Sequence, residues 1–171
     1  LSHGLAVDAL RAAVGTPVGI TLNLNPMRGE AEAVARMDAH QNRWFLDPVL
    51  RGTYPAELLE HYERVFGALP SVNPEDLDVI SRPIDFLGVN YYNRTVVRSE
   101  SLPESDNLPR TVFLAPESEW TEMGWEVHPD GLYRVLCRVH FDYGAPRIYV
   151  TQNGASWSDA PGPDGRVPDQ R

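Results

Sequence analysis

The segment Ile148-Tyr149-Val150-Thr151-Gln152-Asn153-Gly154 decides the fold of this chain. A short run of residues that favour β-structure ends in a polar pair and a glycine, which predicts a buried strand with polar side chains at its C-terminal tip. In parallel α/β architectures, ligands and catalytic groups lie at that tip of the sheet. The segment therefore predicts a parallel α/β fold with a site beside Gln152.

Two earlier segments have the same character. Residues 18–25 and 84–92 are nearly continuous apolar runs. The first run ends in the polar residues Asn23 and Asn25, and the second ends in Asn90 and Tyr92. Strands of this kind separated by helices favour a parallel sheet, and their polar tips converge on one rim, as in a (β/α)8 barrel. A complete barrel needs about 250 residues. Residues 1–171 are therefore expected to form one domain, part of a barrel that has been cut at both ends.

Apolar periodicity and turn residues place the other elements. Four residues at i, i+4 spacing predict the apolar stripe of a first helix: Leu1, Leu5, Ala9 and Ala13. Further helices are expected over residues 30–45, 56–69, 76–80 and 128–143. The helix over residues 30–45 is predicted to be broken by the pair Asp47-Pro48. Residues 95–98 and 111–114 are rich in β-formers. Asp85 opens the strand over residues 84–92, where a role in stability is expected.

Composition narrows the class of partner. The net charge of −9 argues against nucleic acid or an anionic membrane, and a neutral or cationic small ligand is easier to accommodate. No apolar run approaches the roughly 20 residues that span a bilayer. Cys137 is the single cysteine, which excludes an internal disulfide and favours the cytoplasm, although a secreted protein stays open. Cys137 and His140 lack a second pair of ligands, so no metal site is expected.

Four segments, in order and at matching spacing, resemble family 1 glycoside hydrolases, the β-glucosidase clan. The four segments are residues 41–48 with 52–55, residues 85–92, residues 123–127 and residues 148–154. The last of them corresponds to a strand that reads Ile/Val-Thr-Glu-Asn-Gly in the family. The resemblance covers nearly the whole chain. It implies strands five to seven of a (β/α)8 TIM barrel with their helices, and a retaining β-glycosidase, specifically a β-glucosidase. It also implies no cofactor, and a small β-glucoside or oligosaccharide as substrate.

The resemblance assigns the central role to position 152. The family has its nucleophilic Glu there, and this chain has Gln152. A neutral amide is a poor nucleophile, and it cannot offset the positive charge that develops in an oxocarbenium-like transition state. The expected behaviour is sugar binding without turnover.

Other family roles fall on matching positions. Tyr92 matches a tyrosine whose hydroxyl hydrogen-bonds the nucleophile, and Asn90, two residues earlier, lies on the same face of the strand. Trp125 matches a tryptophan that stacks against the aglycone. Asn23 and Asn25 are expected to line the aglycone entrance.

The chain also departs from the family pattern. The general acid/base of the family is the Glu of an Asn-Glu-Pro tripeptide, and no such tripeptide occurs here. Catalysis is therefore expected to require the remainder of the barrel. Two interpretations stay open: a β-glucosidase inactivated by a Glu→Gln change, and a natural, non-catalytic carbohydrate-binding homologue.

Several aromatic residues are expected to have structural roles. Tyr91 alternates with Tyr92 and is assigned to packing, and Trp44 is assigned to packing within its helix. Trp120 is expected in a loop. Trp157 follows the turn after Gln152, and a structural role is favoured for it.

Overall fold

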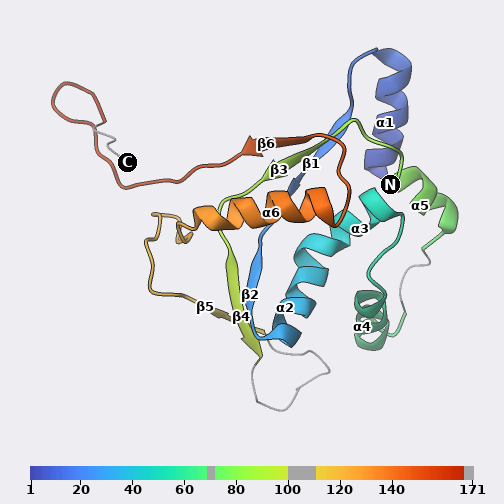
Figure 1. The fold of residues 1–171 in the computed structure, drawn as a ribbon, viewed down its shortest axis with the longest axis horizontal. Coiled ribbons are helices and arrows are strands. Elements are labelled where there is room, and N and C mark those ends of the chain that lie inside the picture. Colours follow the sequence, from blue (N-terminus) through green and yellow to red (C-terminus); the bar gives the residue numbers. More distant parts are fainter. Residues whose placement is uncertain (69–71, 100–110, 168–171) are drawn as a thin grey trace.

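A three-stranded parallel sheet forms the centre of the computed structural model, which describes residues 1–68, 72–99 and 111–167. Its strands are β1 (Gly19–Asn23), β3 (Phe86–Asn90) and β6 (Ile148–Gln152), in the order β1-β3-β6. Both pairings are parallel, as the sequence predicts (Figure 1). The strands are shorter than predicted at their polar ends, where the chain leaves the sheet.

Alternation along the strands divides the sheet into a covered face and an open face. Leu22, Leu87 and Val89 pack against α6 (Pro129–Phe141) through its buried residues Val135 and Val139. Leu87 and Val89 are completely buried, and each contributes about 1.5–3 kcal/mol through lost apolar exposure.

The open face carries small and polar side chains. A Cβ atom on Gly88 would overlap the Thr21 hydroxyl and would lie 3.0 Å from a Thr151 methyl group, so these residues share one face of the sheet. Thr21 and Thr151 are exposed. The site residues at the strand tips lie on this side.

The helical segment after β1 is continuous where a break was predicted. It comprises α2 (Ala31–Asp38), a five-residue π-helix η1 (Ala39–Arg43) and α3 (Trp44–Arg51), which contains Pro48. The predicted break at Asp47-Pro48 is therefore wrong. Proline removes one helical hydrogen bond, but the burial of Pro48 together with Leu46 and Val49 offsets that loss. The helix ends at Gly52, whose φ of 68° suits glycine.

The remaining helices differ from prediction mainly at their ends. α4 covers Ala56–Phe66 and stops at Gly67, so the predicted helix over residues 56–69 is too long, and Leu69 lies outside the described residues. α5 covers Pro74–Ile80 and begins two residues earlier than predicted, because proline is favoured in the first helical turn. α6 ends at Phe141, two residues before the predicted end.

The first helix, α1 (Ser2–Ala13), presents a different face from the predicted one. Leu1, Leu5, Ala9 and Ala13 are all exposed, and Gly4 and Val7 are buried instead. A Cβ atom on Gly4 would overlap the carbonyl oxygen of Val79 in α5. The absence of a side chain at Gly4 thus permits α1 and α5 to pack closely. The apolar residues at i, i+4 spacing did not indicate this contact.

A smaller sheet lies beyond the tips of β1 and β3. It contains β2 (Met27–Gly29), β4 (Thr95–Ser99) and β5 (Thr111–Leu114), in the order β2-β4-β5. The β-rich segments 95–98 and 111–114 are confirmed as strands. β2 was not predicted, because its three residues follow Pro26 and include Gly29, which does not read as a strand.

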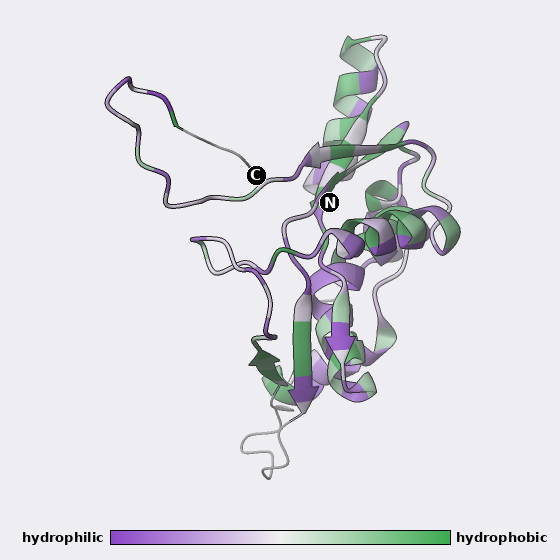
Figure 2. Ribbon diagram, turned by 60° about the vertical axis from the view of Figure 1, so that its left-hand side comes forward, coloured by the Kyte–Doolittle hydropathy of each residue, from purple (hydrophilic) through white to green (hydrophobic). Residues whose placement is uncertain are grey.

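The segment after β6 extends away from the sheet and is largely hydrophilic (Figure 2). It contacts the loop before α6, where the Glu122 amide donates to the Ser156 carbonyl at 3.0 Å. Among the helices in the described ranges, none has both the length and the apolar character required to cross a membrane.

Candidate active site

A β-bulge at the end of β6 shapes the centre of the site. Val89 pairs with Val150 and Asn90 pairs with Gln152, so Thr151 is an extra residue in β6. A bulge turns side chains away from strict alternation, and here two consecutive residues reach the same partner. The Thr151 hydroxyl donates to Asn90 Oδ1 at 2.7 Å, and Asn90 Nδ2 donates to Gln152 Oε1 at 3.0 Å.

A second donor reaches the same oxygen of Gln152. The Tyr92 hydroxyl also donates to Gln152 Oε1, so two side chains of one strand end converge on one acceptor. The structure thus brings Asn90, Tyr92 and Gln152 together, as expected from the alternation of residues 90 and 92. Two donors directed at one oxygen make an environment that also favours a carboxylate.

Trp125 lies beside Tyr92. Their ring centroids are 4.7 Å apart, with 37° between the ring planes. The turn that carries Trp125 is closed by the Thr121 amide, which donates to the Trp125 carbonyl at 2.8 Å, and the Trp125 amide donates to the Thr121 hydroxyl at 3.2 Å. The two rings therefore form a fixed aromatic surface next to Gln152.

A groove of about 400 Å³ continues from this aromatic surface. Four of the predicted site residues line it: Asn23, Asn25, Tyr92 and Trp125. Asn90 and Gln152 are not among its lining residues and lie at the strand tips, where Gln152 is exposed. The lining also includes Gln41, Phe113 and Trp120. Aromatic faces and amide groups together suit the C–H faces and hydroxyl groups of a sugar.

An ion pair connects the segment that carries Tyr92 with the segment that carries Trp125, and its cation, Arg94, lines the groove. Arg94 donates to both oxygens of Glu126 at 2.7 and 2.8 Å, and the Glu126 side chain is only 3% exposed. The hydrogen bonds from Arg94 lower the pKa of Glu126 below its usual value. This pair was not predicted. Its signal in the sequence is a cation two residues after Tyr92 and an anion directly after Trp125.

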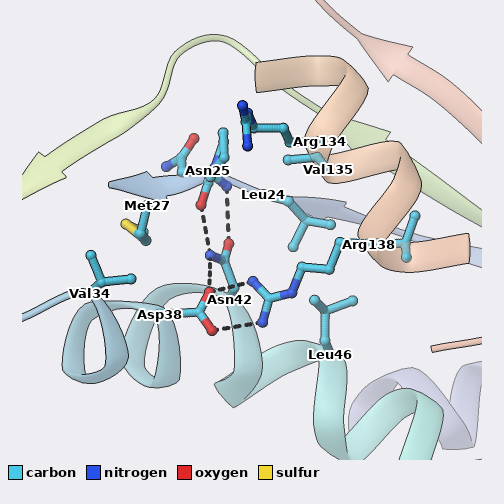
Figure 3. Close-up of a pocket in the computed structure, with 12 residues that line it drawn as sticks. Leu24, Asn25, Met27, Val34, Asp38, Asn42, Leu46, Arg134, Val135 and Arg138 are labelled. Atoms are coloured by element: carbon cyan, nitrogen blue, oxygen red, sulfur yellow. Dashed lines mark hydrogen bonds and ion pairs between the residues drawn. The ribbon is translucent and has the colours of Figure 1, made fainter. Parts of the chain in front are cut away.

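A buried amide fixes the edge of the groove at Asn25. The Asn25 amide donates to Asn42 Oδ1 at 3.0 Å, and Asn42 Nδ2 donates to the Asn25 carbonyl and to Asp38 Oδ1, both at 2.7 Å. Arg138 of α6 binds both carboxylate oxygens of Asp38 (Figure 3). Figure 3 shows these residues lining a second pocket, of about 260 Å³. Asn42 is 2% exposed and was also not predicted.

Tyr91, which was assigned to packing, lies directly beneath the site. Tyr91 is buried, its hydroxyl donates to the His128 carbonyl, and burial raises its pKa to about 12. Asn153 Nδ2 donates to the Tyr91 carbonyl at 2.7 Å, which ties the residue after Gln152 to β3. The packing role predicted for Tyr91 is therefore confirmed.

Structural roles were also predicted for Asp85, Trp44 and Trp120, and the contacts of these residues are as follows. Asp85 accepts from the Val18 amide at 2.8 Å and from Arg11 at 3.2 Å, and these contacts lower its pKa, in keeping with a role in stability. Trp44 packs against the ring of Tyr54 at 4.6 Å, as predicted. Trp120 lies in the loop between β5 and α6, as predicted, where it pairs with Glu126 in an isolated β-bridge and lines the groove.

Comparison with known proteins gives the family. The whole chain, residues 1–171, matches the profile of glycosyl hydrolase family 1. The chain belongs to glycosyl hydrolase family 1. It is 40% identical to a bifunctional β-D-glucosidase/β-D-fucosidase of Bifidobacterium breve over 93% of its own length, and 36% identical to β-glucosidase A of Acetivibrio thermocellus over 100%. It spans 37% and 39% of the lengths of these two relatives.

Solved family 1 structures agree with the fold. The chain superposes on the β-glucosidase of Exiguobacterium antarcticum B7 with a TM-score of 0.88 and 34% identity, covering 99% of this chain and 39% of that one. It also superposes on the Thermotoga maritima β-glucosidase in complex with deoxynojirimycin, with a TM-score of 0.84 and 34% identity, covering 37% of that chain. The chain is thus an α/β structure that corresponds to part of the family 1 enzymes.

Proposed function

We propose that this chain forms strands five to seven, with their helices, of the (β/α)8 barrel of a retaining family 1 β-glucosidase, and that Gln152 occupies the nucleophile position. The convergence of Asn90 and Tyr92 on Gln152 Oε1 carries the proposal. Donors aimed at one oxygen stabilise an ionised carboxylate and fix its direction, which are the requirements for a nucleophile at this place.

The chemistry explains why the amide stops the reaction. In a retaining glycosidase, a carboxylate attacks the anomeric carbon and forms a glycosyl ester, which water then hydrolyses with help from a second carboxyl group. Gln152 offers an oxygen in the same position without the negative charge. It accepts the same hydrogen bonds, but it cannot balance the charge of the transition state. The chain is therefore proposed to support sugar binding and to block turnover.

The remaining residues have roles around this centre. Asn90 and Tyr92 orient the side chain at position 152, and Trp125 offers an aromatic face to the aglycone. Asn23 and Asn25 line the entrance of the same groove. We propose that further strands of the barrel supply the general acid/base, because the Asn-Glu-Pro tripeptide is absent from these 171 residues.

Restoring the carboxylate tests the proposal. The variant Gln152→Glu, made in the full-length gene product, is expected to raise the hydrolysis of an aryl β-glucoside at least about a thousandfold, because loss of a nucleophile typically costs more than this. Gln152→Asn is the matched control, since it keeps an amide, and it is expected to remain inactive.

Binding of deoxynojirimycin shows whether each variant retains a folded sugar site. If Gln152→Glu binds this sugar analogue without any gain in hydrolysis, the proposal of an inactivated β-glucosidase is wrong. The chain would then belong to a non-catalytic carbohydrate-binding homologue.

A further inference from the structure

We propose that Thr151 is a positioning residue for the nucleophile position, because its hydroxyl donates to Asn90 Oδ1 and stabilises the orientation in which the Asn90 NH2 group faces position 152. The chain of hydrogen bonds runs from the Thr151 hydroxyl to Asn90 Oδ1 at 2.7 Å and from Asn90 Nδ2 to Gln152 Oε1 at 3.0 Å. The role in catalysis rests on the function proposed above, whereas the orientation of the amide does not.

The bulge makes this contact possible. In a regular strand, successive side chains point to opposite faces, so residues 151 and 152 could not both reach Asn90. The extra residue in β6 removes that restriction, and Thr151 and Gln152 contact the two ends of one amide group. Gly88, two residues before Asn90, leaves space for the Thr151 side chain. A Cβ atom on Gly88 would lie 3.0 Å from the Thr151 methyl group and 3.1 Å from the Thr151 hydroxyl.

The orientation of Asn90 matters because its amide has two unlike ends of nearly the same shape. The NH2 group donates and the carbonyl oxygen only accepts. In the observed orientation the NH2 group faces position 152. A rotation by half a turn would place the carbonyl oxygen against Gln152 Oε1, where two acceptors repel each other. The acceptor at position 152 selects the observed orientation. The Thr151 hydroxyl, which can donate or accept, stabilises this orientation by donating to Asn90 Oδ1, and it polarises the amide toward position 152.

This orientation has a defined consequence for a carboxylate at position 152. A hydrogen bond donated to the charged form of an acid lowers its pKa and keeps it ionised at lower pH. Without the Thr151 hydroxyl, Asn90 donates less effectively and Tyr92 remains as the second donor. The carboxylate introduced by Gln152→Glu would then hold its proton to a higher pH and would be aimed less accurately.

The first test measures the amide itself in the full-length gene product with Gln152 present. In protein labelled with 15N in the asparagine side chains, the Asn90 NH2 signal is expected to shift and to lose protection from solvent exchange in Thr151→Val. Thr151→Ser retains a hydroxyl and is expected to keep the parental signal. An unchanged Asn90 signal in Thr151→Val would overturn the inference, whatever the catalytic activity.

The second test measures kinetics in the Gln152→Glu background. Adding Thr151→Val is expected to lower kcat/KM roughly two- to tenfold, about the effect of one hydrogen bond between neutral groups, and to move the acidic limb of its pH profile to higher pH. Adding Thr151→Ser instead recovers most of the rate and the original limb. An unmoved acidic limb in Thr151→Val would also contradict the inference. A failure of Gln152→Glu alone to hydrolyse β-glucosides overturns the proposed function, and the asparagine signal then decides on Thr151.

Discussion

Gln152 lies at the end of β6 with two hydrogen bonds on one side-chain oxygen. The donors are Asn90, the last residue of β3, and Tyr92, two residues beyond it. A site that presents two donors to one oxygen is better matched electrostatically to a carboxylate than to an amide. In the function that we propose, the amide retains the shape of a glutamate side chain and lacks its charge.

Removal of the Tyr92 hydroxyl is predicted to slow the reaction. In the Gln152→Glu background, Tyr92→Phe is expected to lower kcat about 10- to 100-fold, because one charge-assisted hydrogen bond to the nucleophile is lost. The acidic limb of the pH profile is expected to move to higher pH, since the charged form loses a donor. Steady-state kinetics between pH 4 and pH 8 measure both effects.

Tyr133→Phe is the matched control for that experiment. It removes a hydroxyl from a ring that is 67% exposed on α6 and does not line the groove. It is expected to leave both kcat and the pH profile unchanged. Equal rates for Tyr92→Phe and the Tyr133→Phe control would show that the Tyr92 hydroxyl has no part in the reaction.

The sequence predicted some of these residues and not others, for physical reasons. Asn90 and Tyr92 follow from strict alternation along one strand, which is a local property. The contact between Thr151 and Asn90 depends on a bulge, and a bulge is defined only by the pairing of two strands. Gln152 itself was identified by its resemblance to the family strand, since a lone glutamine at a strand tip has no specific signal.

The elements hold the site through a few buried polar contacts. Asn42, in the π-helical turn η1, binds both backbone groups of Asn25 and so joins the groove to the helical layer. Arg94 and Glu126 join the segment after β3 to the segment before α6. Neither was predicted, because a buried polar side chain has no periodic signature in sequence. The break predicted at Pro48 failed for a related reason, since tertiary burial outweighed a local preference.

The ion pair between Arg94 and Glu126 leads to a prediction about how stability depends on pH. Glu126→Gln is expected to lower the free energy of unfolding by about 2–3 kcal/mol at pH 7, because Arg94 loses a buried charged partner. The folded-state pKa of Glu126 lies below its unfolded value, so the pair stabilises the protein above the unfolded pKa. This stability is lost as the pH falls through the folded pKa.

Denaturant unfolding over a range of pH measures this effect. Between pH 7 and pH 3, the parent protein is expected to lose more stability than Glu126→Gln. Glu119→Gln is the control, because Glu119 is exposed in the same segment, and it is expected to follow the parent. Parallel pH profiles for Glu126→Gln and the parent would show that the pair does not contribute as described.

The sheet of this chain has an open edge and an open face, where we propose that the rest of the barrel continues. Tyr149 and Val150 of the edge strand β6 are 51% and 46% exposed, and the face that carries Gln152 is also open. The chain spans 37–39% of the relatives that it matches, so the rest of the barrel and the second catalytic carboxyl group are proposed to come from outside these residues. The parallel order of the three strands was predictable, because each is apolar and ends in polar residues. The smaller sheet was predictable only in β4 and β5.

Covalent labelling tests most directly whether position 152 is the nucleophile position. Cyclophellitol is a glucose-shaped epoxide, found in complex with the Thermotoga maritima β-glucosidase, and a carboxylate nucleophile can open its ring to form an ester. The full-length gene product should be treated with it in the parental form and as Gln152→Glu, and analysed by intact mass and peptide mapping. We predict one added inhibitor on the peptide containing residue 152 in Gln152→Glu, and none in the parent. A label on a different carboxylate, or no label in a variant that binds deoxynojirimycin, would contradict the account.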